Sequence, residues 1–404
     1  MKSRQVSFFV FIGIFNLCIV AMIGVLMRYK IGFEFPYFEQ KHLLHAHSHF
    51  AFSGWVSHIL YSMMFWFLEK NDIKSSAISG LIWTNLICAY GMLLSFIYQG
   101  YGGISITFST LSILVSYVYA YTFIKALQQI PDHHPSKNWF KASLFFNVLS
   151  SLGTFYLAYM MVSKNIDQNY YLGSVYFFLH FQYSGWFLFA IAGLFFAKLH
   201  EIVGFRYNPK IFLYFFVSCI PAFFLSILWI KLPWYVFIIP VVAVLQQLWG
   251  LKLFLEMMKS QYEIIKNAGT RLVRLILGLS FLALIIKIML QTGSIIPEVS
   301  KLAFGFRSIV IAYLHLVLLA FTTLYLLGYL LWNGFISHHK MAVSALILFT
   351  LGVFANEFVL MVQGIASFGY ILIPHLNEIL VGISLFMFFS LILLLVFFQK
   401  GRTL

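Results

Sequence analysis

Twelve apolar segments, each long enough to cross a lipid bilayer, follow one another along the whole chain. A helical span needs about 20 apolar residues, because the hydrocarbon core is about 30 Å thick. The chain is 62% hydrophobic and 9% charged, which excludes a water-soluble domain of this length. We therefore predict an all-α polytopic membrane protein, in which residues 1–404 form a single integral membrane domain. The predicted spans are 6–27, 43–68, 77–98, 104–128, 140–162, 172–197, 209–230, 234–257, 272–292, 304–331, 341–363 and 372–398.

The basic residues predict how these spans are oriented. If both termini are cytoplasmic, 18 of the 26 Lys and Arg residues lie on the inner side. Cytoplasmic loops of membrane proteins carry such an excess of basic residues. We therefore expect an integral protein of the bacterial inner (cytoplasmic) membrane with its N and C termini cytoplasmic. Because topology and contact with membrane lipid account for the net charge of +14, we expect no nucleic-acid partner.

A histidine recurs in a matching context in each third of the chain. His49 opens H-F-A-F-S-G-W and His180 opens H-F-Q-Y-S-G-W, while His315 opens the weaker echo H-L-V-L-L-A-F. The three histidines are 131 and 135 residues apart. This repetition predicts three quasi-repeated arcs of four helices around a central site. An imidazole inside a membrane is costly, so each of these histidines indicates a functional site.

The second predicted span begins with a dense group of histidines. On a helix, His42, His45 and His49 share one face, whereas His47 points away and shares its face with His58. Imidazole is the usual axial ligand of haem iron and a common ligand of copper. Within the same motif, Gly54 would let a flat group or another helix approach closely, and Trp55 fills the slot that Trp186 fills in the second motif.

These residues resemble subunit I of the heme–copper oxidase superfamily, which has twelve helices in three arcs. The stretch L-H-A-H-S-H-F-A-F-S-G at 44–54 is similar to the low-spin haem motif of that family, which implies His45 as an axial ligand. The stretch Y-L-H-L-V-L at 313–318 is similar to the family's H-x-H-x-V-L, which implies His315 as the second ligand. Arg307 precedes His315 by a little more than two turns and is suited either to a haem propionate or to snorkelling toward the lipid headgroups. Gly54 and Trp55 complete the predicted cofactor-binding residues.

The departures from the family pattern change the expected function. Tyr313 stands where the family has the ligand of its high-spin haem, and residues 209–230 contain none of the family's copper-binding histidines. The oxygen-reducing centre therefore looks absent, and we lean away from an enzyme. What remains is a b-type haem with two histidine ligands, which favours electron transfer or a response to nitric oxide. A respiratory-chain protein is the expected redox partner.

Several alternatives stay open on the residues. The internal repeat makes His49, rather than His45, the equivalent of His180 and His315, so that His49 and His180 are also candidate metal ligands. With copper as a second cofactor, the chain would be a haem- and copper-containing nitric-oxide-response protein. A secondary transporter of a metal ion or small solute is the third reading. Lys287 fits a proton route or a snorkelling side chain, and His133, His134, His200, His338 and His339 fit solvated loops.

Overall fold

The computed structural model describes residues 4–230 and 233–398, and in these ranges every regular element is a helix. Ten described helices are long and apolar enough to cross a membrane, and the number is eleven if the bent pair α9 (Pro209–Cys219) and η3 (Pro221–Ile227) is counted as one span. The predicted span 43–68 is helical throughout, from Gln40 to Lys70, but is not among these because its histidines reduce its hydropathy. The predicted all-α membrane fold is confirmed.

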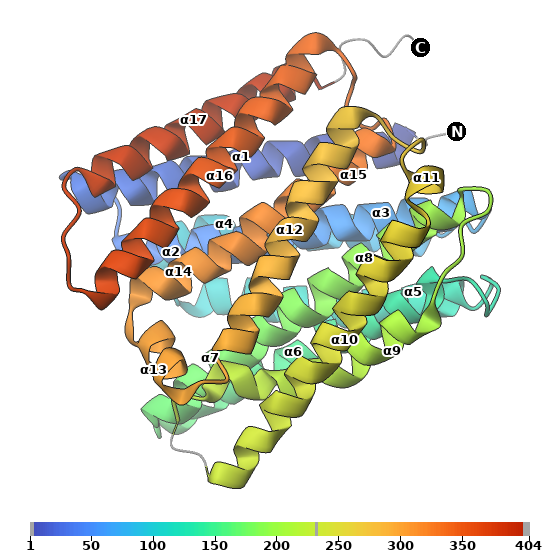
Figure 1. The fold of residues 1–404 in the computed structure, drawn as a ribbon. Coiled ribbons are helices and arrows are strands. Elements are labelled where there is room, and N and C mark those ends of the chain that lie inside the picture. Colours follow the sequence, from blue (N-terminus) through green and yellow to red (C-terminus); the bar gives the residue numbers. More distant parts are fainter. Residues whose placement is uncertain (1–3, 231–232, 399–404) are drawn as a thin grey trace. The chain divides into compact units, whose positions relative to one another are not determined.

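The chain divides into two compact units, and unit 1 joins the two ends of the sequence. It comprises Met1–Gln129 and Thr323–Leu404. The described elements are α1 (Arg4–Gly32), α2 (Gln40–Phe50), η1 (Ala51–Ser57), α3 (His58–Lys70), α4 (Ser76–Gln99), α5 (Gly103–Leu127), α15 (Leu324–Trp332), α16 (Lys340–Phe368) and α17 (Leu376–Val396). The N-terminal helix α1 packs along the C-terminal helix α17, as Figure 1 shows. Helix α17 also packs along α16, the helix that precedes it in the chain.

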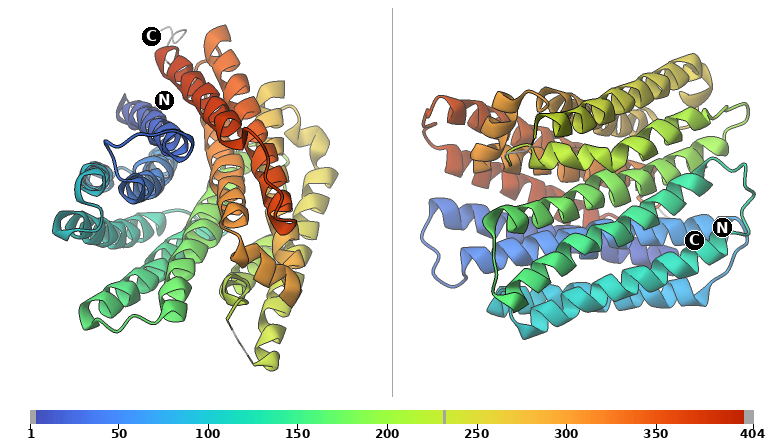
Figure 2. Two further views of the ribbon diagram at one scale, coloured as in Figure 1. Left: turned by 90° about the vertical axis from the view of Figure 1, so that its left-hand side faces the viewer. Right: turned by 90° about the horizontal axis from the view of Figure 1, so that it is seen from below.

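Unit 2 comprises Ile130–Thr322. Here α6 packs on α7 and α8, and α9 packs on α10, which can be followed in both views of Figure 2. The boundary between the units falls inside η5 (Leu316–Thr323). The other elements are α6 (Ser136–Ser163), α7 (Gln168–His180), η2 (Phe181–Phe187), α8 (Leu188–His200), α9, η3, η4 (Trp234–Phe237), α10 (Ile238–Ser260), α11 (Tyr262–Ile265), α12 (Arg271–Gly293), α13 (Pro297–Gly305) and α14 (Arg307–His315).

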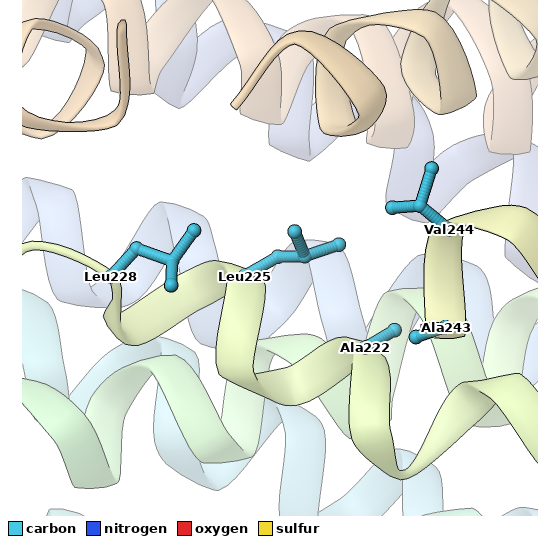
Figure 3. Close-up of a cluster of buried hydrophobic side chains, with 5 residues drawn as sticks. All are labelled: Ala222, Leu225, Leu228, Ala243 and Val244. Carbon is cyan, nitrogen blue, oxygen red and sulfur yellow. The ribbon is translucent and has the colours of Figure 1, made fainter. Parts of the chain in front are cut away.

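The bent span of unit 2 is held by a small apolar cluster (Figure 3). Pro221 has no N–H to continue the helix, so α9 gives way at Cys219 to η3 with a bend of 45°. Ala222 of η3 meets Ala243 of α10, and two small side chains allow the backbones to approach closely. Leu225, Leu228 and Val244 complete this cluster.

The three histidine motifs share a backbone feature that their sequences do not reveal. Each motif contains a π-helical segment, namely η1, η2 and η5. The second and third begin directly after His180 and His315, and the first begins two residues after His49. Wide π turns are rare and are frequently found at functional sites. Their recurrence supports the predicted internal repeat, and it includes the third motif, which lacks the Gly-Trp pair.

Candidate functional site

The histidines of the second span lie on two faces of one helical run, as the spacing predicts. His47 and His58 turn toward α1, where they hydrogen-bond the carbonyl oxygens of Val20 at 3.1 Å and Phe9 at 2.8 Å. His42 lies on the other face and pairs with Glu39 at 3.3 Å. The face toward α1 therefore anchors helix to helix, and the opposite face carries the remaining imidazoles.

His45 and His49 lie against an aromatic patch formed by Phe96 and Tyr101. The ring of His49 stacks on Phe96 with centroids 4.4 Å apart, and its Nε2 lies 3.1 Å from the hydroxyl of Tyr101. His45 meets the same tyrosine ring at 4.5 Å, edge to face. The Nε2 of His45 is buried and has no hydrogen-bond partner in the described part of the chain. The two candidate ligands therefore differ, since only His45 keeps an uncommitted Nε2.

Neighbouring helices stabilise the first π segment through side-chain amides. Asn85 donates to the carbonyl of Ser53 at 3.1 Å, and Asn16 donates to that of Gly54 at 2.6 Å. A Cβ at Gly54 would come within 2.6 Å of the Phe50 ring, so that ring fills the space beside the glycine. Trp55 is 1% exposed and donates its indole N–H to Thr323 at 3.0 Å. Gly54 and Trp55, two of the predicted cofactor-binding residues, are therefore engaged in packing and hydrogen bonding in this structure.

His180 is enclosed at the second π segment. Its exposure is 0%, and its Nε2 bonds the carbonyl of Cys219 at 2.9 Å. In a continuous α-helix the N–H of Phe223 would bond this carbonyl, but here it bonds the carbonyl of Ile220 at 3.1 Å. The Nδ1 of His180 is buried without a partner among the described residues. The Nε2 of His180 therefore ties η2 to the bent span, whereas its Nδ1 remains a potential ligand atom.

A lysine inside unit 2 joins this region instead of reaching the membrane surface. Lys287 is 3% exposed and donates to the hydroxyl of Ser184 at 2.9 Å. The carbonyl of the same serine accepts a weak bond from the Cys219 thiol at 3.7 Å. The snorkelling alternative for Lys287 is therefore wrong, because its nitrogen ends on a buried π segment. The hydroxyls of Tyr183 and Tyr313 share a further hydrogen bond in this unit.

The third histidine is arranged by its own helix. The Nδ1 of His315 bonds the carbonyl of Ile311, one turn earlier in α14, at 2.8 Å. In a neutral imidazole, a proton on Nδ1 leaves the lone pair on Nε2, which is the state of a metal-binding histidine. Arg307 is the first residue of α14 and is exposed. No group of three His, Cys, Asp or Glu side chains in 4–230 and 233–398 is placed to hold a metal ion.

The loop histidines are less uniformly solvated than predicted. His134, before α6, is partly buried against His200 at the end of α8, with ring centroids 4.7 Å apart. Burial, together with the neighbouring imidazoles of His200 and His133, lowers the pKa of His134 to about 4. Close by, a hydrogen bond from Lys137 at 2.7 Å holds the pKa of the exposed Asp132 below its ordinary value. Prediction missed the His134–His200 contact because the loop before α6 and the end of α8 are far apart in the sequence.

Comparison with known proteins places this fold. No protein-family model matches the chain, and no curated protein matches it. Among solved structures, the chain is similar to that of a heme-copper terminal oxidase dimer determined by cryo-EM, with a TM-score of 0.63 and 14% identity. The match covers 98% of this chain and 83% of the oxidase chain. The resemblance seen in the histidine motifs is therefore confirmed at the level of the fold, and this chain has the helical fold of a heme-copper terminal oxidase.

Proposed function

We propose that this protein is a membrane haem protein that uses His45 and His315 to hold a low-spin b-type haem. Its function is electron transfer or a response to a gas such as nitric oxide, in place of oxygen reduction. The observation that carries the proposal is the uncommitted Nε2 of His45. A buried nitrogen without a partner is costly, and a bound metal ion would compensate that cost.

His315 supports the proposal from its own side. Its Nδ1 bond to the Ile311 carbonyl orients the ring and selects the tautomer with the lone pair on Nε2. Such a backbone bond at the second nitrogen also raises the basicity of the ligating one. Exposed Arg307, eight positions earlier, offers a guanidinium for a propionate carboxylate.

The chemistry follows from the two imidazoles. A haem held by the imidazoles of His45 and His315 would supply one-electron transfer and would not be expected to bind oxygen. Tyr313 supports this reading, because it stands where the resemblance assigns the ligand of an oxygen-reducing haem. Its hydroxyl is bonded to Tyr183 instead. We further propose a bacterial inner-membrane location with cytoplasmic termini and a respiratory-chain redox partner.

Two further observations each favour an alternative function. The Nδ1 of His180 is buried and uncommitted, which favours a copper ion there and thus the haem- and copper-containing nitric-oxide-response protein. The broken span at Pro221, beside the buried Lys287, is a feature of secondary transporters, which bind solutes at interrupted helices. It favours a transporter of a metal ion or small solute.

An optical spectrum of the purified full chain, oxidised and then reduced with dithionite, tests these functions. The proposed function predicts haem b with sharp low-spin bands that carbon monoxide does not alter. A spectrum that responds to carbon monoxide, with copper in the metal analysis, would favour the nitric-oxide-response protein. Absence of haem in cells supplied with haem would overturn the proposal, and uptake assays in vesicles would then test the transporter.

A further inference from the structure

We infer that Tyr101 is a positioning residue that keeps His49 away from the iron and thereby leaves His45 as the ligand. The inference rests on the proposed function and concerns this chain's own residues within unit 1. His45 and His49 are one helical turn apart on the same face of the span. Both lie against Tyr101, yet the tyrosine engages them through different parts of its side chain.

The turn between α4 and α5 holds Tyr101 firmly in place. Gly100 has a φ of +61°, and a Cβ there would lie 2.5 Å from the ring of His42, so only glycine fits. Ser105 donates to the carbonyl of Gly100 at 2.7 Å and accepts from the N–H of Gly102 at 2.9 Å. These bonds close the turn on both sides of Tyr101. The tyrosine is therefore presented to the histidine face by a rigid backbone.

Tyr101 commits the Nε2 of His49 whichever group donates. Their separation of 3.1 Å is a normal hydrogen-bond length. If the phenol donates, the lone pair of Nε2 is used, and if the imidazole donates, Nε2 carries a proton. Neither state leaves Nε2 free to bind a metal ion. Stacking on Phe96 at an interplanar angle of 23° further fixes the ring of His49.

His45 is treated differently by the same residue. Its ring packs against the Tyr101 ring at 68°, a contact that fixes orientation without consuming a nitrogen. Its Nε2 remains buried and without a partner in the described residues. Tyr101 therefore prevents Nε2 of His49 from acting as a ligand and orients the ring of His45. This distinguishes the two candidate ligands, which lie one helical turn apart.

The test is whether removing the phenol hydroxyl lets His49 replace His45. We expect His45→Ala in the full chain to lose haem, and the double variant His45→Ala, Tyr101→Phe to regain it, because His49 is then released. The expected recovery is at least about tenfold in haem affinity, the usual effect of a residue that orients a metal ligand. The measurement is pyridine-haemochrome content per purified chain.

Further variants make the outcome decisive. Haem retained by His45→Ala with Tyr101 intact, or haem lost by His49→Ala alone, would overturn the inference. So would a double variant that stays empty while still folded, as judged by gel filtration. Wild-type protein without haem would instead overturn the proposed function, and this inference with it.

A single variant covers the case in which His45→Ala does not fold. Tyr101→Phe alone should add a second low-spin species to the electron paramagnetic resonance spectrum, since His49 then competes for the iron. Adding His49→Phe should remove that species. Tyr98→Phe is the matched control, because Tyr98 is 85% exposed near the end of α4, just before the turn that carries Tyr101. Spectra of Tyr101→Phe that match wild type would overturn the inference.

Discussion

His49 and His180 open nearly the same seven-residue motif, and the structure gives them different surroundings. His49 lies at the start of the first motif, bonded to a tyrosine in a glycine-rich turn. His180 is sealed inside unit 2 and bonds a backbone carbonyl. In its bonding, His180 resembles His58, whose Nε2 also ends on a carbonyl, that of Phe9. Equivalent positions in a repeat therefore share a backbone shape without sharing a chemical role.

The largest effect should come from the ligand histidines. His315→Ala should abolish haem retention, a loss of more than about 100-fold in affinity, because it removes a direct ligand and not merely an orienting group. Haem content per chain is the measurement. His338→Ala, in an exposed loop, is the matched control and should retain haem. Unchanged haem content in His315→Ala would remove His315 from the proposed pair.

The next largest effect tests whether the role of His180 is structural or metal-binding. His180→Ala should lower the free energy of unfolding by about 2–4 kcal/mol, because it opens a cavity and leaves the Cys219 carbonyl unpaired. His58→Ala should cost a similar amount for the same reason. Thermal unfolding in detergent gives both values. If His180→Ala lost bound copper and kept its stability, the metal-binding role would be correct instead.

A smaller effect compares the two π segments directly. Asn85 and Cys219 bond the carbonyls of the equivalent serines, Ser53 and Ser184. Asn85→Ala should destabilise the protein by about 1–3 kcal/mol, since it removes a buried amide donor. Cys219→Ala should cost below about 1 kcal/mol in hydrogen bonding, because a thiol is a weak donor and the contact is 3.7 Å long. Equal costs in unfolding experiments would show that the segments are stabilised alike.

The smallest effect is the pH dependence of stability that comes from His134, in the loop before α6. The pKa of His134 is about 4 in the folded protein, below its ordinary value of 6.5. The unfolded chain therefore binds the proton more readily, so stability is full above pH 6.5 and is lost as pH falls toward 4. After a discount for solvent screening of a partly exposed group, the loss is about 1 kcal/mol.

His134→Gln should flatten this dependence between pH 6.5 and 4, measured as the midpoint of thermal unfolding. His133→Gln, on an exposed neighbour, should leave the slope nearly as it is in wild type. An unchanged slope in the His134 variant would assign the acid sensitivity to other groups.

The sequence by itself determined the helical spans, the membrane environment and the two histidine faces of the second span. Apolar length and helical period are local properties, so they can be read without knowing the fold. Only the tertiary structure decided which imidazole nitrogens are committed. The carbonyl of Cys219 bonds a histidine 39 positions away, and Tyr101 reaches His49 across 52 positions. Such bonds depend on how helices pack, because the donor and acceptor belong to segments whose proximity no local pattern encodes.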